Sequence, residues 1–194
     1  MFALLIFKNK LIMEITTKQI LKMLYVLSWI IFVGVSIEAG GIIFNSIFTL
    51  FINPAAANNL FNRTDLSGLY NHDSGYFFVI TFIMSIVAVL KAIMFYLIVK
   101  ILHDKKLNLS EPFTKEFGSF IFNLFYLVLG IGCFSTGGKR CAEWLMKQGV
   151  QMPDMESLHI GGADVWLFMA VILFVIAHIF KRGIEIQTEN ELTI

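Results

Sequence analysis

The sequence between residues 76 and 101 reads YFFVITFIMSIVAVLKAIMFYLIVKI, and this stretch decides the fold. It contains no acidic residue and two lysines, Lys91 and Lys100. A helix needs about 20 apolar residues to cross the hydrocarbon core of a bilayer, so this run is long enough to span a membrane. Three further apolar runs occupy residues 20–52, 117–135 and 162–180. The sequence therefore predicts an all-α integral membrane protein, a four-helix bundle of up-and-down topology.

The composition supports a single membrane domain. Of the 194 residues, 57% are hydrophobic and 15% are charged, an excess of apolar surface that a soluble domain of this size cannot bury in one core. The connections between the runs are too short for an independent soluble domain. We expect an N-terminal arm over residues 1–19, the four spans within 20–180, and a tail over 181–194. A second methionine, Met13, makes residues 1–12 a dispensable extension or an interfacial arm, and the true start stays open between Met1 and Met13.

Positive charge predicts the orientation. Ten basic residues fall in the first, third and fifth soluble segments: Lys8, Lys10, Lys18, Lys22, Lys100, Lys105, Lys106, Lys115, Lys181 and Arg182. The other side holds four: Arg63, Lys139, Arg140 and Lys147. Because basic residues near helix ends are retained in the cytoplasm, we expect both termini to be cytoplasmic.

The first apolar run is too long for a simple span. Its 33 residues would form a helix of about 50 Å, whereas the hydrocarbon core is about 30 Å thick. The helix must tilt, project or break, and Gly40-Gly41 is the expected weak point. Ser36 and Gly40 also form a small-residue pair that would admit a neighbouring helix. Pro54 is expected to stop this helix.

The connections carry local signals. Thr114 is a candidate N-cap of the third helix, with Glu116 in its first turn. The stretch Lys139–Val150 is mildly amphipathic, so Trp144, Leu145 and Val150 are expected to lie on the membrane surface. Cys133 and Cys141 would form a disulfide in an oxidising compartment if their geometry allowed it, and otherwise stay free thiols. An extracellular ligand site is a further alternative, built from the polar residues Glu143, Asp154, Glu156, His159 and Asp164.

Two ionisable residues, Glu38 and Lys91, fall inside the spans. A charge in lipid is costly unless it is paired or reaches water, so both should face the bundle interior and are candidates to pair. Counting residues from the inner side places Glu38 about 24 Å deep and Lys91 about 15 Å deep, which weakens a direct pair. The functional interpretation is an ion or proton relay, and the structural one is a pair or two separately satisfied groups.

No catalytic pattern is present in the sequence. It lacks a Ser/His/Asp set, an HExxH motif, a phosphate-binding glycine loop and a nucleic-acid footprint. His178, near Lys181 and Arg182, is expected to be an interfacial side chain rather than a ligand. We therefore expect no enzyme activity, no cofactor, no metal and no direct nucleic-acid binding.

The tail is the most specific segment. Residues 179–194 read IFKRGIEIQTENELTI, ending in apolar residues although they follow the last span. Gly183 is a candidate C-cap of the fourth helix. Apolar residues at such an end are expected to dock, either on this protein's own cytoplasmic turn at Lys105 and Lys106 or on a partner.

This tail and the turn Glu111-Pro112-Phe113-Thr114 resemble the bacterial four-helix membrane family known as domain of unknown function 2975 (DUF2975). The family pattern is met by Ile179, Phe180, Gly183, Gln187, Glu189, Leu192, Thr193 and Ile194, and the resemblance extends over about residues 13–194. It implies a bacterial cytoplasmic (inner) membrane location and no established activity. Genes of such proteins often neighbour one for a small helix-turn-helix repressor, which suggests a cytoplasmic transcription regulator as a partner by association alone.

These observations lead to two hypotheses. The first is a noncatalytic membrane regulator or interaction protein whose candidate docking residues are Pro112, Phe113, Gly183, Gln187, Glu189, Leu192, Thr193 and Ile194. The second is a small transporter or channel that uses Glu38 and Lys91. Membrane lipid is a partner in either case, and the sequence leaves open whether the protein forms a homo-oligomer.

Overall fold

The computed structural model of the protein describes residues 2–104 and 114–191, with side chains for residues 19–104 and 114–189. Four long helices dominate it: α1 (Phe2–Phe51), α3 (Ser74–His103), α4 (Lys115–Lys147) and α5 (Ala163–Glu191). Two short helices, η1 (Pro54–Asn59) and α2 (Ser67–His72), lie in the connection between α1 and α3. Each long helix contains a segment that is long and apolar enough to cross a membrane: Gln19–Phe51, Ser74–His103, Lys115–Lys147 and Ala163–Glu189. The predicted all-α, four-span architecture is confirmed.

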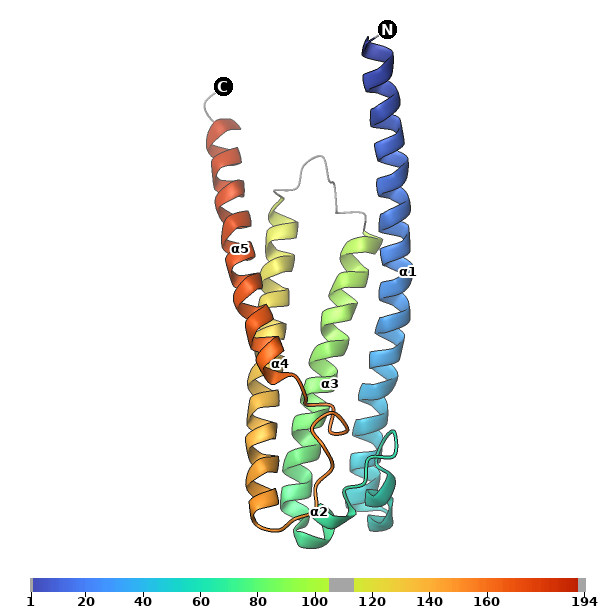
Figure 1. The fold of residues 1–194 in the computed structure, drawn as a ribbon, viewed down its shortest axis with the longest axis vertical. Coiled ribbons are helices and arrows are strands. Elements are labelled where there is room, and N and C mark those ends of the chain that lie inside the picture. Colours follow the sequence, from blue (N-terminus) through green and yellow to red (C-terminus); the bar gives the residue numbers. More distant parts are fainter. Residues whose placement is uncertain (1, 105–113, 192–194) are drawn as a thin grey trace.

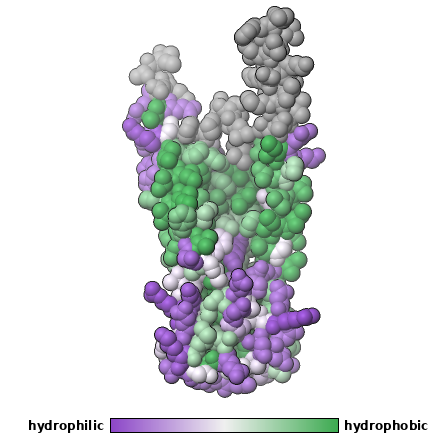
Figure 2. Space-filling model, viewed as in Figure 1, coloured by the Kyte–Doolittle hydropathy of each residue, from purple (hydrophilic) through white to green (hydrophobic). Residues whose placement is uncertain are grey.

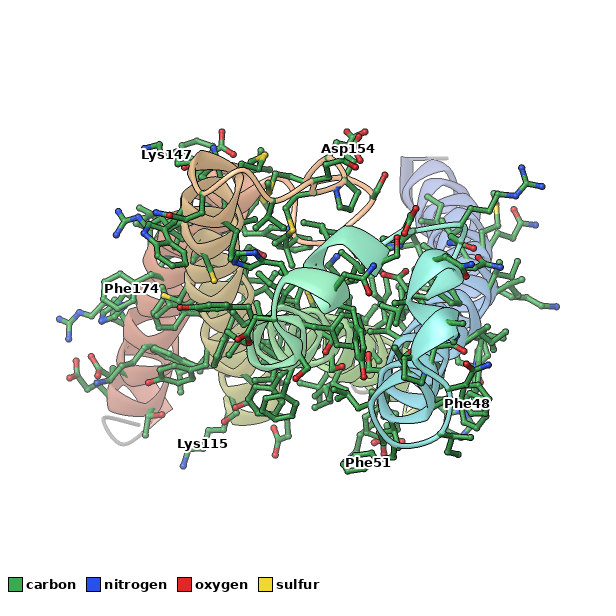
Figure 3. The ribbon with its side chains drawn as sticks, turned by 90° about the horizontal axis from the view of Figure 1, so that it is seen from below. Phe48, Phe51, Lys115, Lys147, Asp154 and Phe174 are labelled. Atoms are coloured by element: carbon green, nitrogen blue, oxygen red, sulfur yellow. The ribbon has the colours of Figure 1, made fainter. Side chains whose placement is uncertain are left out.

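The long helices stand in a row in the order α1, α3, α4, α5, each antiparallel to the next (Figures 1 and 3). Within the described residues, α1 packs against α3 but contacts neither α4 nor α5. Both ends of the chain lie at one end of this row, which we call the terminal end (Figure 1). The opposite end, with η1, α2 and the connection between α4 and α5, is the loop end.

The surface is divided between apolar and polar zones. On the face shown in Figure 2, a hydrophobic band crosses the molecule between hydrophilic residues at the loop end and a smaller number toward the terminal end. Large apolar side chains of the band face outward, such as Ile30 of α1 and Phe168 of α5, each 65% exposed. Such a band is what the hydrocarbon core of a bilayer covers.

α1 does not break at Gly40-Gly41, contrary to the expected weak point. The helix runs without interruption to Phe51, and Pro54 follows in η1 as predicted. Gly41 instead makes room for the ring of Phe61. The nearest ring carbon lies 2.5 Å from the position that a Cβ at residue 41 would occupy, which is too close for any larger residue. Gly40 has no described neighbour within 4 Å of its own Cβ position, so the pair of Ser36 and Gly40 does not admit a second helix here.

α4 begins as predicted and ends later than predicted. The Phe117 amide donates a hydrogen bond to Thr114 Oγ1 at 3.2 Å, and Glu116 lies in the first turn. The helix then continues beyond residue 135 to Lys147.

The expectation that residues 139–150 lie on the membrane surface is wrong, because this stretch is largely the last part of α4. Leu145 is fully buried there and Val150 is buried just after the helix, whereas Trp144 is exposed. The amphipathic pattern reflects one helix face in the protein core and the other, with Lys139 and Arg140, exposed.

α5 also continues further than predicted. Gly183 does not cap it, and the helix runs to Glu191. The side chain of Ile184 packs against Gly118 of α4, which keeps this part of α5 beside its neighbour.

The two cysteines, Cys133 and Cys141, are free in the described part of the chain. Both lie on α4, eight residues apart, which corresponds to a rise of about 12 Å along one helix. A disulfide requires Cα atoms within about 7 Å, so these two thiols do not pair within one chain.

Candidate functional site

The connection between α4 and α5 folds back into the helical row. After α4 the chain passes through residues 148–162 and places Leu158 and Ile160 in the core, 0% and 1% exposed. Ile160 packs against Gly138 of α4, beside Ile83 of α3. The hydroxyl of Thr64 donates a hydrogen bond of 3.0 Å to the Ser157 carbonyl, which ties this segment to the connection before α3. We call residues 157–162 the re-entrant segment.

The re-entrant segment enters the helical row from the loop end. Ile160 packs against Gly138, which is two residues, or about 3 Å along the helix, from exposed Arg140. Lys91 reaches the segment from further inside the row, since its neighbour Leu90 lies against Gly130, ten residues from Arg140. Non-helical backbone between membrane-spanning helices is tolerated where it is buried in protein or lines a water-filled cavity.

Three polar side chains meet at this segment. His159 Nδ1 lies 2.9 Å from Glu38 Oε1 of α1, and the two side chains are 21% and 22% exposed. Lys91 Nζ of α3 donates a hydrogen bond of 3.1 Å to the His159 carbonyl oxygen. The same ammonium lies 6.0 Å from the centroid of the Trp166 ring of α5. The first helix, the second span, the re-entrant segment and the last helix thus all contribute to one cluster.

This geometry explains why two charged residues are tolerated inside the spans. The His159 carbonyl would otherwise be an unpaired backbone acceptor inside the helical row, at a cost of about 1–3 kcal/mol. Lys91 satisfies that acceptor and keeps its charge near the Glu38 carboxylate and the face of an indole ring. Glu38 in turn holds the ring of His159, so each charge has a partner.

His159 has an unusual backbone conformation, with φ of +56°. A left-handed conformation costs a non-glycine residue roughly 1–2 kcal/mol. The buried neighbours Leu158 and Ile160, the hydrogen bond from the His159 amide to the Glu156 carbonyl (2.9 Å), and the contact with Glu38 offset this cost. Gly162, at φ +69°, then turns the chain into α5.

Glu38 and Lys91 therefore lie in one cluster, as the sequence suggested, but they meet through His159 rather than through an ion pair between them. The expected difference in their depths is wrong. Tyr25 Oη and His103 Nδ1 are 2.9 Å apart, which fixes the register of α1 and α3. Glu38 is 13 residues from Tyr25 and Lys91 is 12 residues from His103, so both lie about 18–20 Å from that contact.

The five polar residues proposed for an extracellular ligand site do not converge. Glu143 lies 3.9 Å from Lys139 on its own helix, and together with Asp164 these two line a cleft of about 350 Å³ between α4 and α5. The Asp154 carboxylate accepts hydrogen bonds from Ser157, which lower the pKa of this exposed group. His159 turns away into the cluster with Glu38.

The predicted docking residues are partly described. Gln187 and Glu189 are exposed on the projecting end of α5, and Gly183 is half-buried within the helix. Pro112, Phe113, Leu192, Thr193 and Ile194 lie outside the described residues. Within residues 2–104 and 114–191, no group of three or more His, Cys, Asp or Glu side chains is placed to hold a metal ion.

From the sequence, His159 is one polar loop residue among five, and its contact with both Glu38 and Lys91 was not predicted. The available signal was indirect: two opposite charges inside the spans each require a polar partner, and the loop end offers His159 beside two apolar residues, Leu158 and Ile160. An alternation of this kind next to a polar loop is typical of a segment that packs inward.

A comparison with protein families finds one match. The model described as protein of unknown function (DUF2975) matches residues 59–194, which include α3, α4, α5 and the re-entrant segment. Neither the curated proteins nor the solved structures give a match. Glu38 lies outside the matched region, whereas Lys91 and His159 lie within it.

Proposed function

The chain belongs to the DUF2975 family of membrane proteins, and from this premise we propose that it is a noncatalytic regulator whose terminal end binds a soluble protein. The proposal places it in a bacterial cytoplasmic (inner) membrane with both termini inside. The basic residues Lys22, Lys100, Lys115 and Lys181, which lie toward the terminal end, support that orientation.

The observation that carries the proposal is the projecting end of α5. Phe180 contacts Phe117 of α4 with ring centroids 5.0 Å apart, and Ile184 packs against Gly118. Beyond this point residues 185–189 are exposed although the helix continues, and Ile186 is 46% exposed. An exposed apolar side chain on a helix that extends past its neighbour suits a groove on a partner.

The acidic residues of this segment favour a basic partner surface. Glu185 Oε2 lies 3.1 Å from Arg182 Nη1, but both side chains are largely exposed, so this pair contributes little to stability and does not prevent binding. The family resemblance suggests a small helix-turn-helix transcription regulator. DNA would then be contacted by the partner and not by this chain.

Site-specific photocrosslinking in native membranes tests this proposal. With a photoreactive residue at Ile186, we expect a crosslink to a soluble protein with a helix-turn-helix domain, identified by mass spectrometry, and loss of that product when residues 192–194 are deleted. The matched control places the same residue at Val175, a lipid-facing position of the same helix. Crosslinks from Ile186 to this chain alone would contradict the proposal.

A small transporter or channel is the second candidate, favoured by the cluster of Glu38, His159 and Lys91 between the helices. The partial exposure of Glu38 and His159 is the observation that supports it. Proton flux in proteoliposomes should then fall on replacing Glu38→Gln. An unchanged flux would remove Glu38 from any such pathway.

A further inference from the structure

The two halves of the helical row are joined along one line. α1 packs on α3, α4 packs on α5, and the pairs meet where α3 contacts α4. In the described part of the chain, no contact joins α1 to α4 or α5 directly. A hinge between the two pairs would therefore run along the α3–α4 contact unless something else holds them together.

The re-entrant segment provides this second connection. His159 binds Glu38 of α1 and Lys91 of α3, while the next residue, Ile160, packs against Gly138 of α4. Gly162 then leads directly into α5. Two adjacent residues thus join one pair of helices to the other, and a change that frees His159 from Glu38 loosens the link to α1.

The charges of the cluster decide when this link is stable. The groups that face His159 are Glu38 from α1, Lys91 from α3, the indole of Trp166 beside that lysine from α5, and the Phe61 ring from the connection before α3. The Glu156 carbonyl accepts the His159 amide, and the Glu156 side chain is exposed. When His159 is neutral and donates Nδ1–H to Glu38, the cluster holds one anion, Glu38, and one cation, Lys91. Its net charge is then zero.

Added protons upset this balance. A proton on His159 gives the cluster a net charge of +1, and a further proton on Glu38 removes its one anion. Two cations, on Lys91 and His159, then remain in a largely buried cluster without a counter-charge. Unpaired charge in that environment is strongly unfavourable, so the segment is expected to move toward water.

We propose that Glu38, His159 and Lys91 form a charge-dependent latch, which protonation of Glu38 from the loop-end side opens, releasing the re-entrant segment and letting the two helix pairs separate. The Glu38 and His159 side chains are each about one-fifth exposed, so neither is sealed inside the helical row. The latch does not depend on the identity of any partner at the terminal end.

Distance measurement between the pairs tests the latch. Spin labels are placed at Val26→Cys on α1 and Val175→Cys on α5, both about half-exposed positions, in the full chain with Cys133→Ser and Cys141→Ala, reconstituted in liposomes. Pulsed electron paramagnetic resonance then gives the distance distribution at about pH 8 and about pH 2.5, which lie above the ordinary pKa of histidine, about 6.5, and well below that of glutamate, about 4.3.

The expected result is one narrow distribution at the higher pH and a longer, broader one at the lower pH. Glu38→Gln should show the broad distribution at both pH values. The matched control is Glu143→Gln, the same change at an exposed position of α4, which should behave as the unsubstituted protein does.

A distribution that is the same at both pH values in the unsubstituted protein would overturn the proposal, and so would a Glu38→Gln protein that keeps the narrow distribution. If Glu38→Gln does not fold, the pH series on the unsubstituted protein decides the matter by itself.

Discussion

The two ends of the helical row are built differently. At the loop end, connecting segments lie among the helices and contact one another, as Thr64 does Ser157, or a helix, as Phe61 does Gly41 of α1. At the terminal end, the described contacts join neighbouring helices only, as Tyr25 and His103 join α1 to α3. In Figure 1, α3 and α4 stand further apart toward the terminal end. Loops that enter the helical row thus add to the helix–helix packing at the loop end.

This difference has a mechanical meaning. Long helices transmit a small change of angle at one end as a larger displacement at the other. The loop end is held by helices and connecting segments and the terminal end by neighbouring helices only, so we expect relative movement of the helices to be larger at the terminal end. Substitutions at matched positions of the two ends measure how unequal they are.

The largest effect is expected at Gly138. A Cβ there would lie 2.9 Å from Ile160 and 3.0 Å from Ile83, so Gly138→Leu should destabilise the protein by about 3 kcal/mol through overpacking. Gly118→Leu, on the same helix at the terminal end, meets the tip of the Ile184 side chain, which can move, and should cost about 1 kcal/mol.

Thermal unfolding in detergent, followed by loss of helicity, measures both changes. The control is Gly137→Leu, since no described atom lies within 4 Å of that Cβ position. Equal destabilisation at Gly138 and Gly118 would show that the two ends are packed alike.

A smaller effect is expected at Lys91. Lys91→Met keeps most of the side-chain volume but leaves the His159 carbonyl without its donor, at a cost of about 1–3 kcal/mol. Lys139→Met makes the same change at an exposed position and should leave the unfolding temperature nearly unchanged. If the two variants unfold at the same temperature, the Lys91 hydrogen bond does not hold the re-entrant segment.

The smallest effect compares two hydroxyl groups. Thr64→Val removes the hydrogen bond to the Ser157 carbonyl in a buried setting and should cost about 1 kcal/mol. Tyr25→Phe removes an exposed hydroxyl that lies 2.9 Å from His103 at the terminal end, and should cost less. Hydrogen exchange of the residues around each site would show the change locally, and greater loss of protection at Tyr25 than at Thr64 would reverse the proposed order.

The spans were predictable because a helix in lipid needs apolar side chains, and hydropathy can be read from the sequence alone. The expected runs 20–52 and 76–101 agree closely with Gln19–Phe51 and Ser74–His103. The run 117–135 ended too early because the next part of α4 exposes Lys139 and Arg140 to water while Leu145 packs into the protein. Hydropathy averages over the two faces of a helix and therefore misses its continuation.

Two of the three cluster residues, Glu38 and Lys91, were predictable from the sequence, because a charge inside an apolar span needs a partner. Their common depth depends on helix register, which the contact between Tyr25 and His103 fixes and residue counts from the membrane surface did not. The partner, His159, is brought in by a loop whose path is decided by tertiary packing of Leu158 and Ile160.

The close fit of Phe61 into Gly41 limits how this protein can vary. The aromatic ring occupies the volume that any larger residue at position 41 would need, yet Gly41 lies before the region that matches the family and Phe61 within it. Replacing the first helix with another hydrophobic helix is therefore expected to destabilise the protein, unless the replacement keeps a glycine at position 41 or position 61 carries a smaller residue. We expect the residues at positions 41 and 61 to vary together among related proteins.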